Sequence, residues 1–273
     1  MVTHGGDTVK LGSGASIWYR RQGSGPPVLH IHGSAFGHRN FEKLTPLMVH
    51  RYEVIDFDLP GYGLSRGGPT PEGMTGLADQ VAEFVLALGY ERLHVHGTSF
   101  GAMIGLTLAA YHPALIDRLV LSCFLARYDE AARMMRGTWK RAARDSGMEA
   151  VADLTSVAGF ARRFYERNWA QEQLQSMRDA FSHTDPEAFI ASTEAIERTD
   201  LSPLVGRVQA PTLLLAGDED NMTPFNPAPS GVGMAQIATM LPDAKTAVIE
   251  ECGHYLVIEA ADRVAGLIAE FLG

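Results

Sequence analysis

The chain has 273 residues, of which 46% are hydrophobic and 20% charged, a composition typical of a globular protein with a sizeable core. Its 23 basic and 32 acidic side chains give a net charge of −9, which argues against nucleic acid or an anionic membrane as the main partner. The first ten residues lack a signal-peptide pattern, no run of about 18 apolar residues occurs, and two cysteines cannot form a disulfide framework. We therefore expect a cytoplasmic protein whose partner is a small molecule, while its oligomeric state cannot be read from the sequence.

Short apolar segments recur along the chain, each rich in Val, Ile or Leu and each ended by turn residues. This pattern is typical of strands that are buried on both faces of a sheet. Helical patterns lie between them, as in 75–89, where the apolar side chains fall on one face. The alternation predicts an α/β fold with a mostly parallel sheet flanked by helices, entered through an antiparallel hairpin at 9–21. The expected strands are 28–33, 52–61, 92–97, 118–124, 211–218 and 245–253.

Residues 126–205 interrupt this alternation. They are polar, rich in Arg, Glu and Ala, and are typical of several helices without a buried strand. Because the segment is too long for one crossover connection, we expect a helical cap inserted after strand 118–124. The core would then comprise residues 1–125 and 206–273. The alternative is a set of ordinary helices that cover the sheet.

The strand at 92–97 leads directly into Gly97-Thr98-Ser99-Phe100-Gly101, and a helical pattern follows. A serine in G-x-S-x-G at a strand-to-helix turn is typical of a nucleophile elbow, where the turn is sharp and the hydroxyl projects at the carboxyl end of the sheet. The alternative is a serine that only caps the helix. The context favours Ser99 as a nucleophile.

A serine hydroxyl needs a base that removes its proton, and a carboxylate should orient that base. Of the ten histidines, His254 lies between the last expected strand and the last helix, at the same sheet edge as Ser99. Asp218, Glu219 and Asp220 follow the strand before it, and the chain order Ser, Asp, His fits an elbow-bearing hydrolase. Asp220 lies further into the loop than Asp218, which we expect to cap the turn instead.

Five motifs together give the chain a resemblance to the α/β-hydrolase superfamily along nearly its whole length. The resemblance implies a catalytic triad of Ser99, Asp220 and His254, with Asp220 as the last residue of a G-x-x-D pattern. It also implies an oxyanion hole formed by the backbone N–H groups of Ser34 and Phe100. The motifs are "HIHGS" (30–34), "DLPGYGLS" (58–65), "HGTSFG" (96–101), "PTLLLAGDEDNMTP" (211–224) and "ECGH" (251–254).

Ser99 distinguishes this chain from haloalkane dehalogenases and epoxide hydrolases of this type, which use an aspartate at the elbow. A serine favours acyl transfer to water, and we predict hydrolysis of a small carboxylic ester or lactone. One alternative is cleavage of a carbon–carbon bond in ring-cleavage products, because the "HGS…RNFEKL" stretch has some likeness to such hydrolases. Those relatives carry a longer Gly-Pro-Gly loop and a Trp where this chain has Tyr255. Another alternative is a ligand receptor of this fold with slow turnover.

The expected pocket is mostly apolar and lined by aromatic side chains. We predict substrate contacts for Trp139, Phe164, Trp169 and Tyr255. Arg162 and Arg163 either face solvent or meet a substrate carboxylate. No cofactor or metal is expected, because the sequence shows neither a His/Cys/Asp cluster with ligand spacing nor a phosphate-binding loop.

Overall fold

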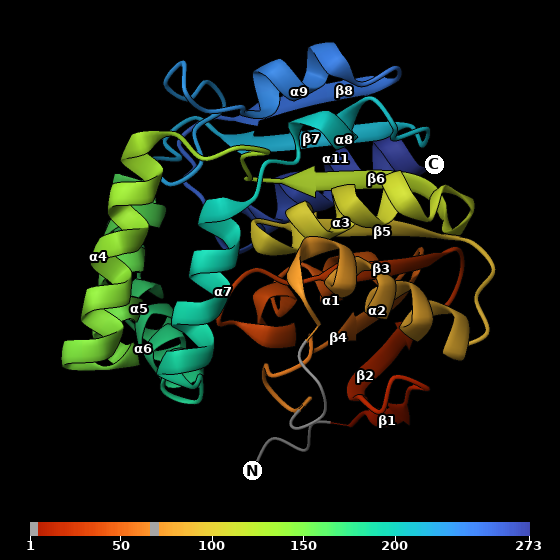
Figure 1. Ribbon diagram of the computed structural model, residues 1–273, viewed down its shortest axis with the longest axis horizontal. Helices are drawn as coiled ribbons and strands as arrows, with labels where there is room; N and C mark the ends of the chain where they lie inside the picture. Colours follow the sequence, from red (N-terminus) through yellow and green to blue (C-terminus); the bar gives the residue numbers. More distant parts are fainter. Residues whose placement is uncertain (1–4, 66–70) are drawn as a thin grey trace.

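The computed structural model describes residues 5–65 and 71–273 (Figure 1). Its centre is an eight-stranded sheet with the order β1-β2-β4-β3-β5-β6-β7-β8. The strands are β1 (Asp7–Lys10), β2 (Ser16–Gly23), β3 (Pro27–Ile31), β4 (Glu53–Phe57), β5 (Leu93–Thr98), β6 (Ile116–Ser122), β7 (Thr212–Gly217) and β8 (Ala244–Ile249).

The sheet is mostly parallel, as predicted. Strands β1, β2 and β4 pair antiparallel, and every pair from β4 through β3 to β8 is parallel. Strand β6 begins and ends two residues earlier than the expected 118–124. After β3 the chain adds β4 on one side and β5 on the other, so the strand order reverses there. Such a switch point at the carboxyl ends of strands is where open α/β sheets bind ligands.

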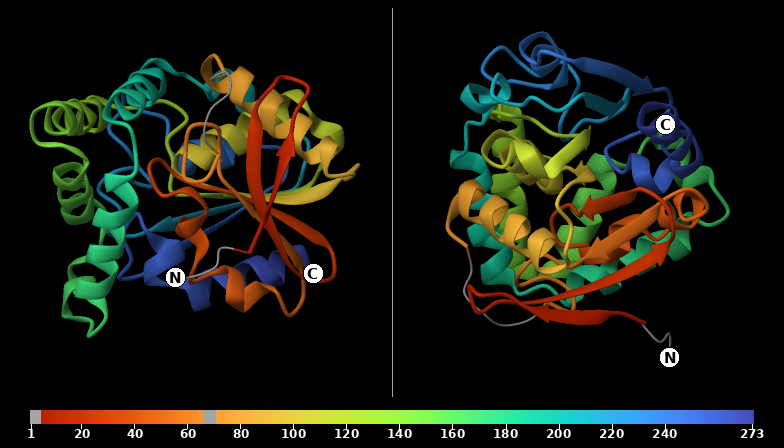
Figure 2. Two further views of the ribbon diagram at one scale, coloured as in Figure 1. Left: turned by 90° about the horizontal axis from the view of Figure 1, so that it is seen from below. Right: turned by 90° about the vertical axis from the view of Figure 1, so that its right-hand side faces the viewer.

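Helices cover both faces of the sheet (Figures 1 and 2). Helices α2, α3, α8 and α9 contribute to one hydrophobic cluster, and α1 and α11 contribute to the other. These elements are α1 (Thr45–Met48), α2 (Gly73–Ala87), α3 (Phe100–Tyr111), α8 (Ser202–Val205), α9 (Met234–Met240) and α11 (Ala261–Leu272), with the short α10 (Leu256–Glu259) before the last.

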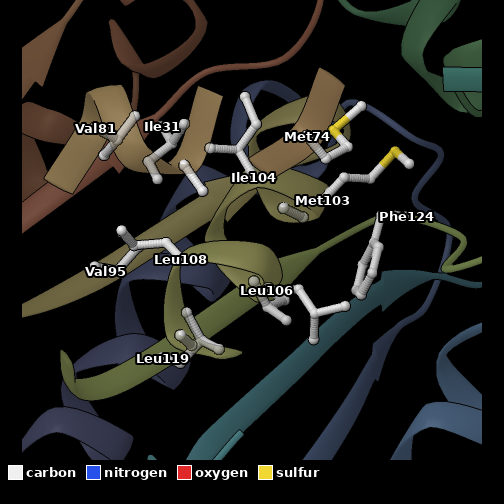
Figure 3. Close-up of a cluster of buried hydrophobic side chains, with 14 of the residues drawn as sticks. Ile31, Met74, Val81, Val95, Met103, Ile104, Leu106, Leu108, Leu119 and Phe124 are labelled. Atoms are coloured by element: carbon white, nitrogen blue, oxygen red, sulfur yellow. The ribbon is translucent and has the colours of Figure 1, made fainter. Parts of the chain in front are cut away.

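Helix α3 lies in the middle of its layer. Every residue from Phe100 to Ala110 is buried, as expected for a helix that is apolar on all sides. Its side chains Met103, Ile104 and Leu108 pack among residues of β3, β5 and α2 (Figure 3). The helix that begins immediately after Ser99 is therefore fixed on all sides, and so is the position of Ser99.

The helices that follow β6 form a separate layer beside the carboxyl end of the sheet, towards which the arrow of β6 points in Figure 1. The chain leaves and returns at one place, where Arg127 forms an isolated bridge with Asp200 and the Leu201 N–H donates to the Ala126 carbonyl at 2.8 Å. Helix α8, within the expected cap range 126–205, packs against α3 instead. We call residues 128–199 the helical insertion. It contains α4 (Glu130–Ser146), α5 (Met148–Gly159), the 3-10 turn η3 (Arg162–Glu166), α6 (Ala170–Ser182) and α7 (Pro186–Arg198).

The insertion shares one continuous hydrophobic cluster with the α11 side of the core. Trp139 and Phe181 of the insertion belong to the same cluster as Phe36 and Tyr255 of the core. Among the described residues, no helix is both long and apolar enough to cross a membrane.

Candidate active site

Ser99 sits in a strained backbone conformation between β5 and α3. Its φ of 54° and ψ of −116° are unusual for a residue with a side chain, and such strain costs about 1–3 kcal/mol. A Cβ at Gly97 would overlap the Gly101 carbonyl, and one at Gly101 would overlap the carbonyl of Ile31. The two glycines are therefore required by the close approach of β3, β5 and α3, which is the physical reason for G-x-S-x-G here.

The structure brings Ser99, His254 and Asp220 together in one hydrogen-bonded chain. The Ser99 Oγ lies 3.0 Å from His254 Nε2, and His254 Nδ1 lies 3.0 Å from Asp220 Oδ2. Both His254 and Asp220 are buried, at 3% exposure each. With an acceptor carboxylate at Nδ1, the imidazole carries its proton there and presents Nε2 as the acceptor for the serine hydroxyl.

The Asp220 carboxylate also accepts three hydrogen bonds from its own loop. Its Oδ1 accepts the N–H groups of Met222 and Thr223, both at 2.9 Å, and its Oδ2 accepts the Thr223 hydroxyl at 2.8 Å. Burial alone would raise the pKa of Asp220, but the neighbouring His254 and the Thr223 hydrogen bonds outweigh it and hold the pKa below its ordinary value. Asp218 is exposed, and its carboxylate accepts the Cys252 N–H at 3.1 Å, so it joins its turn to the loop that carries His254 instead of capping its own turn.

The loop after β3 lies beside Ser99. Asn40 Oδ1 accepts the Gly33 N–H at 2.8 Å and thereby fixes the segment that carries Ser34. His32 holds the same loop from the other side, because its Nδ1–H donates to the Gly33 carbonyl at 2.7 Å and its Nε2 accepts the Leu59 N–H at 2.9 Å. Burial lowers the pKa of His32, which keeps this ring neutral for both hydrogen bonds.

Ser34 and Phe100 are the two residues that the resemblance implies as oxyanion-hole donors. Ser34 lines the same cavity as Ser99, and its buried Oγ has no hydrogen-bond partner in the described chain. Phe100 is the first residue of α3, and the first N–H groups of a helix have no intrahelical acceptor. Its backbone N–H is thus available at the helix start, while its side chain is buried in the core.

A cavity of about 510 Å³, including its opening to solvent, lies over Ser99. Trp139 and Tyr255 line it, as expected, but Phe164 and Trp169 do not. Phe164 is fully buried and stacks on Phe160 with ring centroids 3.6 Å apart. Trp169 is half-buried, and the Lys43 Nζ lies 3.7 Å from its ring centroid. These two expected substrate contacts are instead packing residues of the insertion. The full lining is Gly33, Ser34, Phe36, Asn40, Thr98, Ser99, Arg136, Trp139, Thr155, Phe181, Phe189, Met222, His254, Tyr255 and Val257.

Sequence reasoning missed Cys123, which follows β6 at the same sheet edge. Its Sγ lies within 4.8 Å of ligand atoms of Asp220 and His254, a grouping of a kind that can hold a metal ion. Burial, and then the charge of Asp220, raises the pKa of the thiol well above its ordinary value. A metal ligand must be a thiolate, so the neutral thiol favours a packing role beside the Asp220–His254 pair. The only signal in the sequence was its position near the end of the predicted strand 118–124.

The loop that carries His254 is tied to the insertion by Glu259. One carboxylate oxygen accepts the Gly253 N–H and the other accepts the Ala161 N–H, both at 3.0 Å. The His254 N–H donates to the Gly159 carbonyl at 2.6 Å. Burial raises the pKa of Glu259 to about 7. The insertion therefore contributes directly to the position of the His254 loop.

We expect Glu259→Gln to change how stability depends on pH. The pKa of Glu259 is raised on folding, so its contribution is fully present below the ordinary value of 4.5 and is lost as pH rises through about 7. The free energy of unfolding of the variant, relative to wild type, should increase between pH 5 and pH 8 by at most about 3 kcal/mol. Urea denaturation at both pH values measures this, with Glu130→Gln as control, since that carboxylate is 80% exposed. A difference that stays constant with pH would contradict the assignment.

Residues 26–261 match the sequence profile of a family described as alpha/beta hydrolase fold. The chain belongs to the α/β-hydrolase family. Solved structures agree with this assignment: the enol-lactonase from Burkholderia xenovorans LB400 superposes with a TM-score of 0.86 at 24% identity, covering 97% of this chain and 99% of that one. At that identity the likeness shows the fold alone.

Curated relatives of this α/β-hydrolase are named hydrolases. A 2-hydroxy-6-oxononadienedioate/2-hydroxy-6-oxononatrienedioate hydrolase from Cupriavidus pinatubonensis is 27% identical, covering 96% of this chain and 88% of the relative. A pimeloyl-[acyl-carrier protein] methyl ester esterase from Chromobacterium violaceum is 29% identical, covering 94% and 98%. The protein is therefore a hydrolase, as predicted.

Proposed function

We propose that this hydrolase cleaves a small carboxylic ester or lactone through an acyl-enzyme formed on Ser99. The observation that carries the proposal is the hydrogen-bonded chain from Ser99 through His254 to Asp220, which ends in a cavity lined mostly by apolar and aromatic side chains. A nucleophile and base at hydrogen-bond distance, with the base oriented by a third group, is the arrangement that acyl transfer requires.

In the proposed reaction, His254 Nε2 takes the Ser99 proton as Oγ attacks the carbonyl carbon. The oxyanion that forms is bound by the N–H groups of Ser34 and Phe100, and each such donor lowers the barrier by roughly 3 kcal/mol. The intermediate collapses as the imidazolium gives its proton to the leaving alcohol oxygen. Water, deprotonated by His254, then attacks the acyl-enzyme and releases the acid, and the proton returns to Ser99.

The helical insertion acts in this proposal as a cap on the core. The expected core of residues 1–125 and 206–273 is extended by α8, which packs against α3. Three observations support the role of the insertion as a cap. The insertion leaves and returns through one pair of neighbouring strands, it lies at the carboxyl end of the sheet, and it supplies Arg136 and Trp139 to the cavity lining. We further propose that the enzyme acts in the cytoplasm.

A carbon–carbon bond hydrolase is the second candidate. The relative from C. pinatubonensis is named for an oxononadienedioate substrate, and it matches nearly the whole chain. The esterase from C. violaceum matches at slightly higher identity and supports ester cleavage. A receptor of this fold with slow turnover is the third, and an ordered triad favours the two enzymatic candidates over it.

A substrate panel separates these candidates. Steady-state rates would be measured for p-nitrophenyl esters of increasing acyl length, for a series of lactones and for a ring-cleavage dienone. The proposal predicts the highest kcat/KM for an ester or a lactone, with turnover above about 1 s⁻¹, the lower end for typical enzymes. A dienone that is cleaved faster than every ester and lactone would overturn it in favour of the carbon–carbon hydrolase. A rate of product release far below about 1 s⁻¹ would favour the receptor.

A further inference from the structure

One charged side chain of the insertion lines the Ser99 cavity. Arg136 of α4 is only 4% exposed, and it is the one lysine or arginine among the lining residues. None of the lining residues is Asp or Glu, and Arg136 forms no ion pair with a carboxylate anywhere in the described ranges 5–65 and 71–273. The cavity therefore holds a permanent positive charge in a protein whose net charge is −9.

The Arg136 guanidinium is held firmly but is not satisfied. It lies over the rings of Tyr128 and Trp139, at 4.6 and 5.4 Å from their centroids, and its Nη2 donates to the Tyr128 hydroxyl at 2.6 Å. The buried Nε has no hydrogen-bond partner among the residues described. A guanidinium carries five N–H donors in a fixed plane, so most of its donor capacity is unused.

A buried charge without a partner is costly, and other arginines in this chain avoid that cost. Arg163, considered above as a carboxylate contact, is exposed and pairs with Glu251 at 2.7 Å outside this cavity. Arg20, which is partly buried, pairs with Asp56 at 3.0 Å. Arg136 differs because its buried charge lies in the lining of the cavity that holds Ser99, and the side chains it contacts are neutral.

We propose that Arg136 binds a free carboxylate of the substrate, so that the ester or lactone cleaved at Ser99 carries a second, ionised carboxyl group. This inference rests on the proposed function for the reacting bond, but the recognition of the carboxylate is independent of it. A planar guanidinium pre-ordered by aromatic rings matches a carboxylate with two parallel hydrogen bonds, and the dry surroundings strengthen that pair. A single guanidinium, with no other arginine or lysine in the lining, fits a substrate that carries one such carboxylate.

The test compares substrates that differ only in charge at the far end. Monomethyl esters of linear dicarboxylic acids with four to eight carbons would be measured in a pH-stat beside the matching neutral ω-amides. For wild type we expect kcat/KM for the best acid to exceed that of its amide by at least about tenfold. Arg136→Gln should bring this ratio close to one, and Arg136→Lys should restore part of it.

Arg141→Gln is the control, because Arg141 is an exposed residue of the same helix. This variant should leave the ratio of acid to amide at its wild-type value.

Calorimetric titration of wild type and Arg136→Gln with the dicarboxylic acids and their diamides tests recognition without hydrolysis. Binding of the diacid that is lost in the variant supports the inference even where no ester of the panel is cleaved, an outcome that would count against the proposed function alone. Equal ratios of acid to amide in wild type and Arg136→Gln, with the diacid bound equally by both, would overturn the inference. If Arg136 had a purely structural role, Arg136→Gln would lower the melting temperature. It would also lower kcat/KM for the acid and for the amide by the same factor, so that their ratio would stay unchanged. Preference for an ω-phosphonate over the ω-carboxylate would refute the choice of a carboxylate.

Discussion

Replacement of Ser99 by alanine is expected to lower kcat for the best ester or lactone by about 10⁶-fold, the loss typical when a triad nucleophile is removed. The reason is that, among the described residues, Ser99 carries the only hydroxyl within hydrogen-bond distance of His254 Nε2, at 3.0 Å. The other ring nitrogen, Nδ1, faces the Asp220 carboxylate and the Thr223 hydroxyl. The fold should be retained, because alanine keeps the Cβ that the elbow already accommodates. Rates and thermal unfolding curves of the purified variant measure both expectations.

The matched control for this variant is Ser156→Ala. Ser156 is buried, whereas Ser99 is half-buried, and the Ser156 hydroxyl donates to the Ala152 carbonyl within its own helix and not to His254. It should keep kcat within a few-fold of wild type. Ser99→Ala with near wild-type turnover, or a comparable loss in Ser156→Ala, would remove the basis for a Ser99 nucleophile.

Asp220→Asn is the second large effect and should lower kcat by about 10⁴-fold. The carboxylate of Asp220 accepts a hydrogen bond from His254 Nδ1–H and stabilises the imidazolium that forms as Ser99 loses its proton. An amide can present its NH₂ group to Nδ1, which favours the wrong tautomer and removes the compensating charge. Because the carboxylate also accepts two backbone N–H groups, some loss of melting temperature should accompany the loss of rate.

Asp218→Asn is the matched control for Asp220→Asn. Asp218 is two residues away in the same turn, but its carboxylate accepts the Cys252 N–H and does not contact His254. It should act on stability by about 1 kcal/mol, with kcat nearly unchanged. An inactive Asp218→Asn together with a nearly normal Asp220→Asn would transfer the acid role to Asp218.

The parts of the fold and site that the sequence predicts are those that depend on short-range patterns. The strand, the sharp turn and the helix around Ser99 are adjacent in the chain, so the two glycines and the apolar runs on either side indicate the elbow. Ser99 and His254 are 155 residues apart, yet each follows a parallel strand of the same sheet. Ser99 follows the buried strand β5, and His254 follows β8, an edge strand whose side chains are mostly exposed or half-buried. The carboxyl ends of such strands meet at one edge, which is why chain order alone brings the two residues together.

The pocket lining could not be predicted in the same way. Which face of an insertion helix meets the cavity depends on how α4 to α7 pack, and composition alone does not determine that packing. Trp139 and Phe164 are both aromatic residues of the insertion, but the first lines the cavity and the second stacks inside the insertion. No sequence pattern distinguishes Arg136 from its basic neighbours in α4. The adjacent pair Arg162 and Arg163 was a candidate for a carboxylate contact, but both residues lie outside the cavity. Only the three-dimensional structure distinguishes a buried arginine from an exposed one.

The most direct test of the central claim is to label the wild-type protein with a fluorophosphonate and map the modified peptide by mass spectrometry. A serine activated by His254 should react once per chain, and the adduct should lie on Ser99, with loss of hydrolysis in proportion to labelling. His254→Ala should slow the labelling strongly, because the base that removes the Ser99 proton is gone. An adduct on any other residue, or full hydrolytic activity after stoichiometric labelling of Ser99, would contradict the account.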